Sequence, residues 1–175
     1  IANKVKFIHR NFQEYLNQID NPLVISSPSA WDAFNSLYSI SSNSISLNQS
    51  LQVNAIRKTA ESAKYPVIIG IGGGKIMDCT KAIAKKTKSR SVLIPTILST
   101  TAWLNPSSSL KDGEIVEHAK GKINEILIQP ELISSSPQGL TISGIADLLC
   151  GFNSLSDWIL AHEIEGVRFP KRAKD

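Results

Sequence analysis

The feature of the sequence that most restricts the fold is a glycine-rich turn between an apolar strand and an amphipathic helix. The residues Val67–Ala84 read VIIGIGGGKIMDCTKAIA, with four glycines directly after or within an apolar run. Glycine lets backbone N–H groups approach a ligand closely, and the N-terminus of the following helix adds a partial positive charge. Together with Gly70, Gly72, Gly73 and Gly74, this helix N-terminus predicts an anion site suited to a pyrophosphate.

The spacing of the glycines differs from two common phosphate-binding patterns. The contiguous glycines do not match G-x-G-x-x-G, and Lys75 is not followed by the Ser or Thr of a P-loop. A tight structural turn is the alternative, although one glycine would be enough for that. Asp78, one turn into the helix, either compensates the helix dipole or supports the loop. Five basic residues near the end of the helix are expected on a solvated face: Lys81, Lys85, Lys86, Lys88 and Arg90.

Short apolar runs alternate with helical patterns along the chain. Strands are predicted at Pro22–Ser26, Pro66–Gly70, Ser91–Ile94 and Glu125–Gln129. Helices are predicted at Ala30–Ile40, Gln49–Lys64, Lys75–Lys86 and Ser143–Ala161. The alternation predicts an α/β fold with a Rossmann-like parallel sheet and helices on both faces. Three serine-rich segments are expected as loops, the first holding a short edge strand around Ile45 and Leu47: 39–50, 107–109 and 134–136.

Two further segments carry polar residues that suit a binding site. The residues 93–103 read LIPTILSTTAW, so a hydroxyl-rich loop with Thr96, Ser99 and Thr100 follows a buried strand. Loops at the carboxyl ends of parallel strands bind ligands, and hydroxyl groups there can bond to phosphate or ribose. Asp147 stands alone in a small, apolar stretch, where it is either a helix cap or a metal ligand.

Composition excludes several other classes of protein. In 175 residues, 42% are hydrophobic and 19% charged, which is typical of a globular domain. The net charge of +4 gives no case for a nucleic-acid partner, and no apolar run reaches the roughly 20 residues of a membrane span. Cys79 and Cys150 are expected as two buried thiols. We therefore expect a cytoplasmic location, without nucleic-acid or membrane partners.

Taken together, the three segments resemble the dehydroquinate synthase-like superfamily, which includes iron-containing alcohol, glycerol and glycerol-1-phosphate dehydrogenases. The resemblance is carried by GIGGGKIMDCTKAIA at 70–84, IPTILSTTAW at 94–103, and SGIADLL with SDWILAHEIEG at 143–149 and 156–166. The last segment looks most like the glycerol-1-phosphate dehydrogenase branch. The resemblance covers residues 60–166 well and residues 1–60 loosely.

The resemblance implies a Rossmann-like NAD(P)-binding domain at residues 1–136 and the start of a truncated helical metal and substrate domain at 137–175. The pyrophosphate of the cofactor, NAD or NADP, would be held by Gly72, Gly73, Gly74 and Lys75, with Asp78 supporting the turn. The loop with Thr96, Ser99 and Thr100 matches the second cofactor loop of the family. Asp147 matches the family carboxylate that binds a divalent metal, zinc or iron, which polarises the substrate oxygen during hydride transfer. The implied protein is a homo-oligomeric, metal-dependent NAD(P) oxidoreductase for an alcohol or polyol such as glycerol or glycerol 1-phosphate.

The sequence also departs from the family pattern. The family metal site needs two histidines from a C-terminal domain, and His9, His118 and His162 do not match their positions. A stable site needs three or four ligands, so we expect an incomplete metal site, a chain that is inactive alone, and no assigned catalytic residue. The chain looks like the N-terminal half of a dehydrogenase: a truncated product, a fragment, or one piece of a split enzyme. Thr101 replaces an acid often found there.

Other functions stay open at this point. A lyase of the dehydroquinate synthase kind uses NAD transiently, but that branch usually carries Glu at the position of Asp147. A non-catalytic nucleotide-binding fragment fits the missing histidines. Three residues faintly resemble the substrate loop of the synthase branch, although a solvated turn is the preferred interpretation: Lys120, Lys122 and Asn124. An exposed helix face is predicted to drive self-association or bind a partner: Leu148, Leu149, Phe152 and Trp158.

Overall fold

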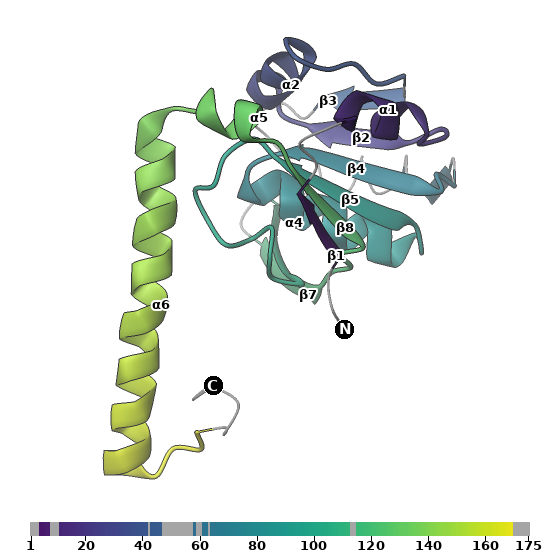
Figure 1. The fold of residues 1–175 in the computed structure, drawn as a ribbon. Coiled ribbons are helices and arrows are strands. Elements are labelled where there is room, and N and C mark those ends of the chain that lie inside the picture. Colours follow the sequence, from purple (N-terminus) through teal and green to yellow (C-terminus); the bar gives the residue numbers. More distant parts are fainter. Residues whose placement is uncertain are drawn as a thin grey trace.

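Six parallel strands form the central sheet of the protein, in the order β1-β8-β5-β4-β2-β3 (Figure 1). The computed structural model describes residues 4–7, 11–41, 43–46, 58, 61–62, 64–112 and 115–169. The strands of the sheet are β1 (Lys4–Phe7), β2 (Leu23–Ser26), β3 (Asn43–Ser46), β4 (Val67–Gly72), β5 (Arg90–Pro95) and β8 (Glu125–Ile128). The predicted α/β class and parallel sheet are therefore confirmed.

Helices cover both faces of this sheet. They are α1 (Phe12–Asn17), α2 (Pro28–Asn35), α4 (Gly74–Lys86) and α5 (Pro130–Ser134), and a further helix, α6 (Gln138–Glu165), follows them. Successive residues of a strand point to opposite faces, so Ile68 packs in the same cluster as Met77 of α4, whereas Ile69 packs with Phe34 of α2. Burial on both faces explains why the central strands are continuous apolar runs rather than alternating ones.

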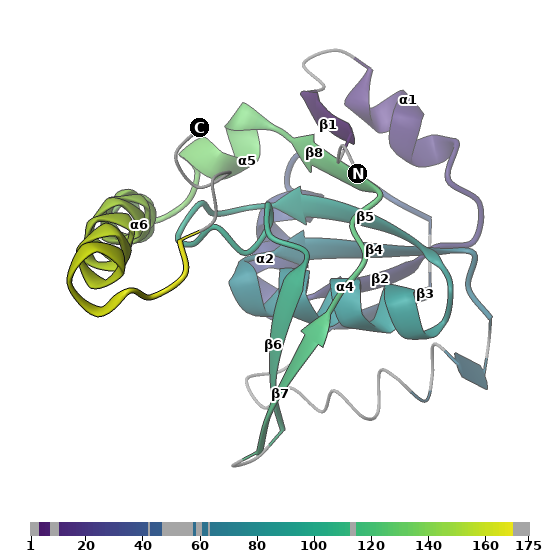
Figure 2. The ribbon, with the colours of Figure 1, turned by 90° about the horizontal axis from the view of Figure 1, so that it is seen from below.

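A β-hairpin stands apart from the sheet and packs on α4 (Figure 2). Its strands are β6 (Ser107–Asp112) and β7 (Ile115–Lys120), paired antiparallel with Ser109 opposite His118. The predicted loop at residues 107–109 is therefore wrong. Ser108 and Leu110 are buried, and pairing with β7 overrides the turn preference of the serines.

The long helix α6 projects away from the sheet (Figure 1). Within this 28-residue helix Gly144 is the one buried residue, and the predicted exposure of four apolar residues is confirmed: Leu148 (56%), Leu149 (59%), Phe152 (69%) and Trp158 (39%). Cys150 also lies on α6 and is exposed, so the prediction of a buried thiol holds for Cys79 and is wrong for Cys150. Among the described helices, α6 included, none has the apolar length required to cross a bilayer.

Other predictions have mixed outcomes. The edge strand around Ile45 is β3, while Leu47 lies outside the described residues. Most of the helix predicted at Gln49–Lys64 also falls outside them, although Lys58, Glu61 and Ser62 are helical. The first strand and helix, β1 and α1, were not predicted. The division of the chain after residue 136 stays a prediction, and it falls in the turn between α5 and α6.

Candidate nucleotide-binding site

The glycine turn joins the carboxyl end of β4 to the N-terminus of α4. Gly73 is the N-cap and provides no side-chain hydrogen bond, so the N–H groups of the first turn have no capping side chain. Gly72 has a φ of 151°, a conformation that residues with a side chain rarely adopt. The chain therefore uses glycine here to present an open helix N-terminus at the edge where parallel sheets bind ligands.

The glycine turn is in contact with the hydroxyl-rich loop that follows β5. A Cβ atom on Gly73 would lie 2.7 Å from Cδ1 of Ile97, and one on Gly74 would lie 3.0 Å from Oγ1 of Thr100. The backbone N–H of Thr96 donates to the carbonyl oxygen of Gly72 at 3.2 Å. Two motifs that are more than twenty residues apart in the sequence thus form one surface.

An open pocket of about 380 Å³ lies between the N-terminus of α4, this loop, β6 and α6. Its walls contain Gly74, Lys75, Asp78, Thr100, Thr101, Ala102, Asn105, Ser107, Ser109 and Asp147. Of the residues predicted to bind cofactor or metal, Gly72, Gly73, Thr96 and Ser99 do not line the pocket, and Thr96 is buried. The structure therefore gathers five predicted residues around one space and places four others beside or behind it.

Asp78 connects α4 to the hairpin. One carboxylate oxygen, Oδ1, is 2.7 Å from Nζ of Lys81, and Oδ2 accepts a hydrogen bond from the backbone N–H of Ser109 at 3.1 Å. Through these contacts Asp78 supports the wall of the pocket at Ser109. Asp78 also lines the pocket.

The prediction that Lys81 lies on a solvated face is wrong. Its side chain is fully buried, and Nζ donates to the carbonyl oxygens of Ala102, Asn105 and Ser107 at 2.7, 2.8 and 2.6 Å. The hairpin that was not predicted at residues 107–109 covers this face of α4, which explains the error. The available signal was the spacing of three residues between Asp78 and Lys81, which places opposite charges on one helix face.

Asp147 touches the hydroxyl-rich loop from α6. Its Oδ2 accepts hydrogen bonds from the backbone N–H of Thr101 at 2.9 Å and from the Thr101 hydroxyl at 3.2 Å. A Cβ atom on Gly144, one turn earlier, would lie 1.6 Å from the carbonyl oxygen of Leu98, so only glycine permits this approach. Asp147 lies well inside α6, which begins at Gln138, and is therefore not its N-cap.

The described residues do not form a metal site by themselves. Among them, no group of three His, Cys, Asp or Glu side chains lies close enough to hold an ion. Asp147 and His162 lie on one continuous helix, fifteen residues and so about 22 Å apart. His118 Nδ1 is 3.0 Å from Oγ of Ser109, and His9 lies outside the described residues. Among the described residues, Asp147 is therefore not part of a three-ligand metal site.

None of the predicted substrate residues lines the pocket: Lys122 and Asn124 lie at the opposite edge of the sheet, whereas Lys120 lies in the hairpin, paired with Ser107. Oδ1 of Asn124 accepts a hydrogen bond from the N–H of Ser91 at 3.0 Å, at the start of β5. Nζ of Lys122 donates to the carbonyl oxygen of Ser89 at 3.3 Å, and Lys120 is exposed. The structure does not bring these three residues to the pocket, and their substrate role stays a prediction.

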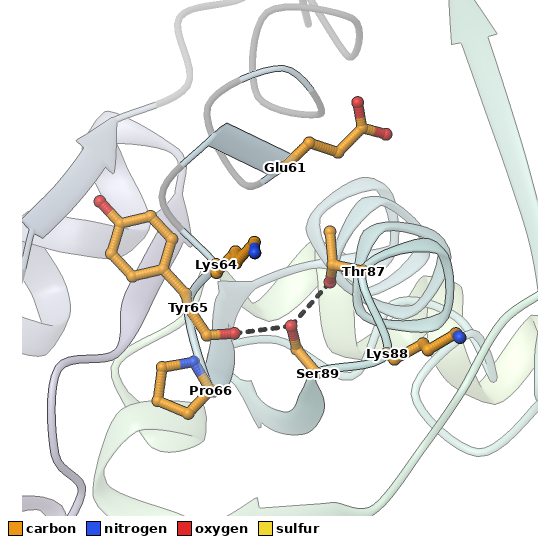
Figure 3. Close-up of a pocket in the computed structure, with 7 residues that line it drawn as sticks. All are labelled: Glu61, Lys64, Tyr65, Pro66, Thr87, Lys88 and Ser89. Atoms are coloured by element: carbon orange, nitrogen blue, oxygen red, sulfur yellow. Dashed lines mark hydrogen bonds between the residues drawn. The ribbon is translucent and has the colours of Figure 1, made fainter.

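A second pocket, of about 420 Å³, lies at this amino edge (Figure 3). It is lined by Glu61, Lys64, Tyr65, Pro66, Thr87, Lys88 and Ser89. The Ser89 hydroxyl donates to the carbonyl oxygen of Tyr65 at 2.7 Å and is also 2.7 Å from Oγ1 of Thr87. These polar atoms are engaged within the protein, and the nearby C-terminus of α4 carries the negative end of the helix dipole. The pocket at the carboxyl edge is therefore the better candidate for a phosphate-bearing ligand.

Comparison with protein families agrees with this geometry. The sequence model described as "Iron-containing alcohol dehydrogenase" matches residues 35–126, more than half of the chain. The chain belongs to the iron-containing alcohol dehydrogenase family. The matched range includes the glycine turn, Asp78 and the hydroxyl-rich loop.

Several relatives of this chain are longer than the chain itself. Glycerol-1-phosphate dehydrogenase [NAD(P)+] of Aeropyrum pernix is 34% identical over 111 residues, which are 62% of this chain and 31% of that protein. A probable glycerol dehydrogenase of Sinorhizobium meliloti has a similar fold, with a TM-score of 0.69, 23% identity, and coverage of 79% and 41% of the two chains. Sulfoacetaldehyde reductase of Bifidobacterium kashiwanohense, solved with NAD+, has a TM-score of 0.69, 15% identity, and coverage of 84% and 50%. The chain spans about a third of the length of the first of these relatives.

Proposed function

We propose that the protein containing this chain is an NAD(P)-dependent dehydrogenase of an alcohol or polyol, such as glycerol or glycerol 1-phosphate, and that this chain binds the cofactor. The observation that carries the proposal is the uncapped N-terminus of α4 beside a pocket at the carboxyl edge of the sheet. The names of the relatives support the dehydrogenase class and the polyol substrate. A cytoplasmic location and a homo-oligomeric state are proposed with it.

The cofactor fits the residues that are present. The backbone N–H groups at Gly73, Gly74 and Lys75 would bind the pyrophosphate, since the helix N-terminus has no capping side chain and the glycines let the hydroxyl-rich loop lie against it. The hydroxyl groups of Thr100 and Thr101 line the same pocket and suit a phosphate or ribose oxygen. Thr96 and Ser99 would act by holding the loop rather than by lining the pocket. The bound nicotinamide would accept or supply the hydride.

Asp147 is proposed as one ligand of a divalent metal, zinc or iron. Thr101 already holds its Oδ2, which fixes the carboxylate at the rim of the pocket. The described residues hold no group of three such ligands, so further ligands would come from elsewhere in the protein. A divalent metal bound there would polarise the substrate oxygen.

Calorimetric titration of the 175-residue chain with NAD and with NADP, each with and without zinc, tests the cofactor proposal. We expect saturable binding of at least one cofactor that zinc leaves unchanged. Binding of neither cofactor would contradict the assignment of the glycine turn. The relative affinities decide between NAD and NADP.

The substrate is tested separately, in the longest natural polypeptide that contains this sequence. Reduction of the cofactor with glycerol or glycerol 1-phosphate would support the dehydrogenase. Cofactor binding without reduction by any polyol would favour a non-catalytic nucleotide-binding protein. That second candidate rests on the lack of a three-ligand metal group among the described residues.

A further inference from the structure

Lys81 combines a full charge with complete burial, which is costly unless the charge is well paired. Among the described residues it is the one charged side chain in the buried set. The ammonium group has three N–H donors and meets four oxygen atoms, three backbone carbonyls and Oδ1 of Asp78, all within 2.8 Å. The chain therefore wraps oxygen atoms around this group as it would around a bound cation.

The carbonyl groups that Lys81 binds belong to one irregular segment. Ala102, Asn105 and Ser107 span the connection from the hydroxyl-rich loop to the start of β6. Asp78 adds a further contact to this segment, because its second oxygen accepts from the N–H of Ser109. One turn of α4 thus holds the chain at four points between residues 102 and 109.

These same residues form a wall of the candidate nucleotide pocket. Ala102, Asn105, Ser107 and Ser109 all line it, opposite the open N-terminus of the helix that carries Lys81. The far side of Lys81 is closed by Gly121, where a Cβ atom would lie 2.4 Å from Cβ of Lys81. The N–H of Lys122 donates to the Lys81 carbonyl oxygen at 3.1 Å. Lys81 is therefore fixed on one side and fixes the pocket wall on the other.

We propose that Lys81 is a positioning residue for the nucleotide site: its buried ammonium group sets the distance between the wall at residues 102–109 and the phosphate-binding N-terminus of α4. The inference rests on the proposed function, because it concerns the same pocket. Lys81 itself does not line the pocket and is not assigned a contact with the ligand. A helix and a wall held by one group keep their spacing when the ligand binds, which reduces the entropy cost of binding.

The test compares NADH affinity in the 175-residue chain and three variants, by NADH fluorescence below the unfolding transition. We expect Lys81→Met to weaken NADH binding about tenfold. Lys86→Met is the charge control, since Lys86 pairs with Glu61 at 2.8 Å on the surface of the same helix. Ile83→Val is the stability control, because Ile83 is a buried residue of α4 outside the pocket. Both controls should stay within about twofold of the unmodified chain, even though Ile83→Val lowers the unfolding temperature.

An affinity of Lys81→Met within twofold of the unmodified chain would overturn the inference. An equal loss of NADH affinity in Ile83→Val would also overturn it, because general destabilisation of the fold would then explain the loss in both variants. If Lys81→Met does not fold, Lys81→Gln is measured in its place, since it removes the ammonium charge and one of the three N–H donors but keeps two for folding, and a smaller loss of NADH affinity is expected. An unchanged affinity in Lys81→Gln, with amide exchange at residues 102–109 also unchanged, would overturn the inference.

A second readout separates this inference from the proposed function. If the unmodified chain binds neither NADH nor NADPH, the nucleotide proposal fails, and hydrogen exchange then tests Lys81 alone. Lys81→Met should speed amide exchange at residues 102–109 about tenfold while β4 keeps its protection. Unchanged exchange in that segment would show that Lys81 does not hold the wall.

Discussion

The two edges of the sheet carry pockets of similar volume, about 380 Å³ at the carboxyl edge and about 420 Å³ at the amino edge. They differ in how their polar groups are used. At the carboxyl edge, glycine leaves the N-terminus of α4 uncapped, and the side chains nearby hold the walls in place. At the amino edge, the hydroxyl group of Ser89 is already bonded to the protein. The two pockets are therefore distinguished by the uncapped N–H groups of α4 at the carboxyl edge, and not by their volumes.

A similar contrast exists between ionisable groups at the two edges. Asp78 and Asp147 at the carboxyl edge hold segments that line the pocket. At the amino edge, Arg90 pairs with Glu125 at 2.5 Å, and the Tyr15 hydroxyl contacts both. The comparison leads to a general expectation. Changes at the carboxyl edge should alter NADH affinity, whereas changes at the amino edge should alter only the stability of the fold.

The largest expected effect follows from filling the glycine turn. Gly73→Val forces a branched side chain against Ile97 and should push the hydroxyl-rich loop away from the N-terminus of α4, which is proposed to bind the pyrophosphate. We expect NADH affinity to fall about 100-fold, the equivalent of about 2.7 kcal/mol, as measured by calorimetry. Gly139→Val is the control, because a Cβ atom at Gly139 meets nothing within 4 Å. Comparable affinities in the two variants would show that the turn does not hold the ligand.

The next effect concerns the contact between α6 and the pocket. Gly144→Ala forces a Cβ atom onto the Leu98 carbonyl oxygen and should displace Asp147 from Thr101. Hydrogen exchange at residues 98–102 should become about tenfold faster. Gly151→Ala changes the same helix where a Cβ atom has open space, so exchange in that loop should not change. An unchanged loop in Gly144→Ala would contradict the close approach.

A smaller effect is expected from single exposed lysines at the two edges. Lys75→Ala removes a positive charge from the wall of the carboxyl-edge pocket and should weaken NADH binding about threefold at low salt. Lys88→Ala removes the same charge from the amino-edge pocket and should leave the NADH affinity unchanged. Titrations at two salt concentrations measure both. A larger loss in Lys88→Ala than in Lys75→Ala would reverse the assignment of the two pockets.

The smallest effect is a pH dependence of stability at the amino edge. Burial, and then the neighbouring Glu125 carboxylate, raise the pKa of Tyr15 from 10.0 to about 12. Folding therefore favours the neutral hydroxyl, so its contribution is complete below pH 10 and is lost as the pH rises toward 12. Urea unfolding between pH 9 and 11 should show a steeper loss of stability in the unmodified chain than in Tyr15→Phe. If the stability of the two proteins changes with pH in the same way, Tyr15 is not the cause of the pH dependence. The NADH affinity should be the same in both proteins.

The central part of the fold could be predicted from the sequence because it depends on local patterns. The apolar runs of β2, β4, β5 and β8 are buried on both faces, and glycine turns are readable wherever a strand meets a helix. The hairpin could not be predicted from Ser107–Ser109, because its strands exist through pairing with each other and packing on α4. Burial of Lys81 depends on that hairpin, so it was missed for the same reason. The contact of Asp147 with Thr101 requires the position of α6, which periodicity does not give.

Helix α6 contacts the rest of the protein closely at Gly144, so a rotation of the helix about this point moves its two ends by very different amounts. Asp147 lies three residues from this contact, about 4.5 Å along the axis, while Glu165 lies twenty-one residues away, about 32 Å. A rotation of about 10° around Gly144 would move the far end by about 5 Å and the carboxylate by under about 1 Å, given the rise of an α-helix. Displacements at the far end therefore reach the pocket reduced about sevenfold, as set by the ratio of those two lengths. The contact at Gly144 therefore preserves the hydrogen bonds between Asp147 and Thr101 when the far end of α6 moves.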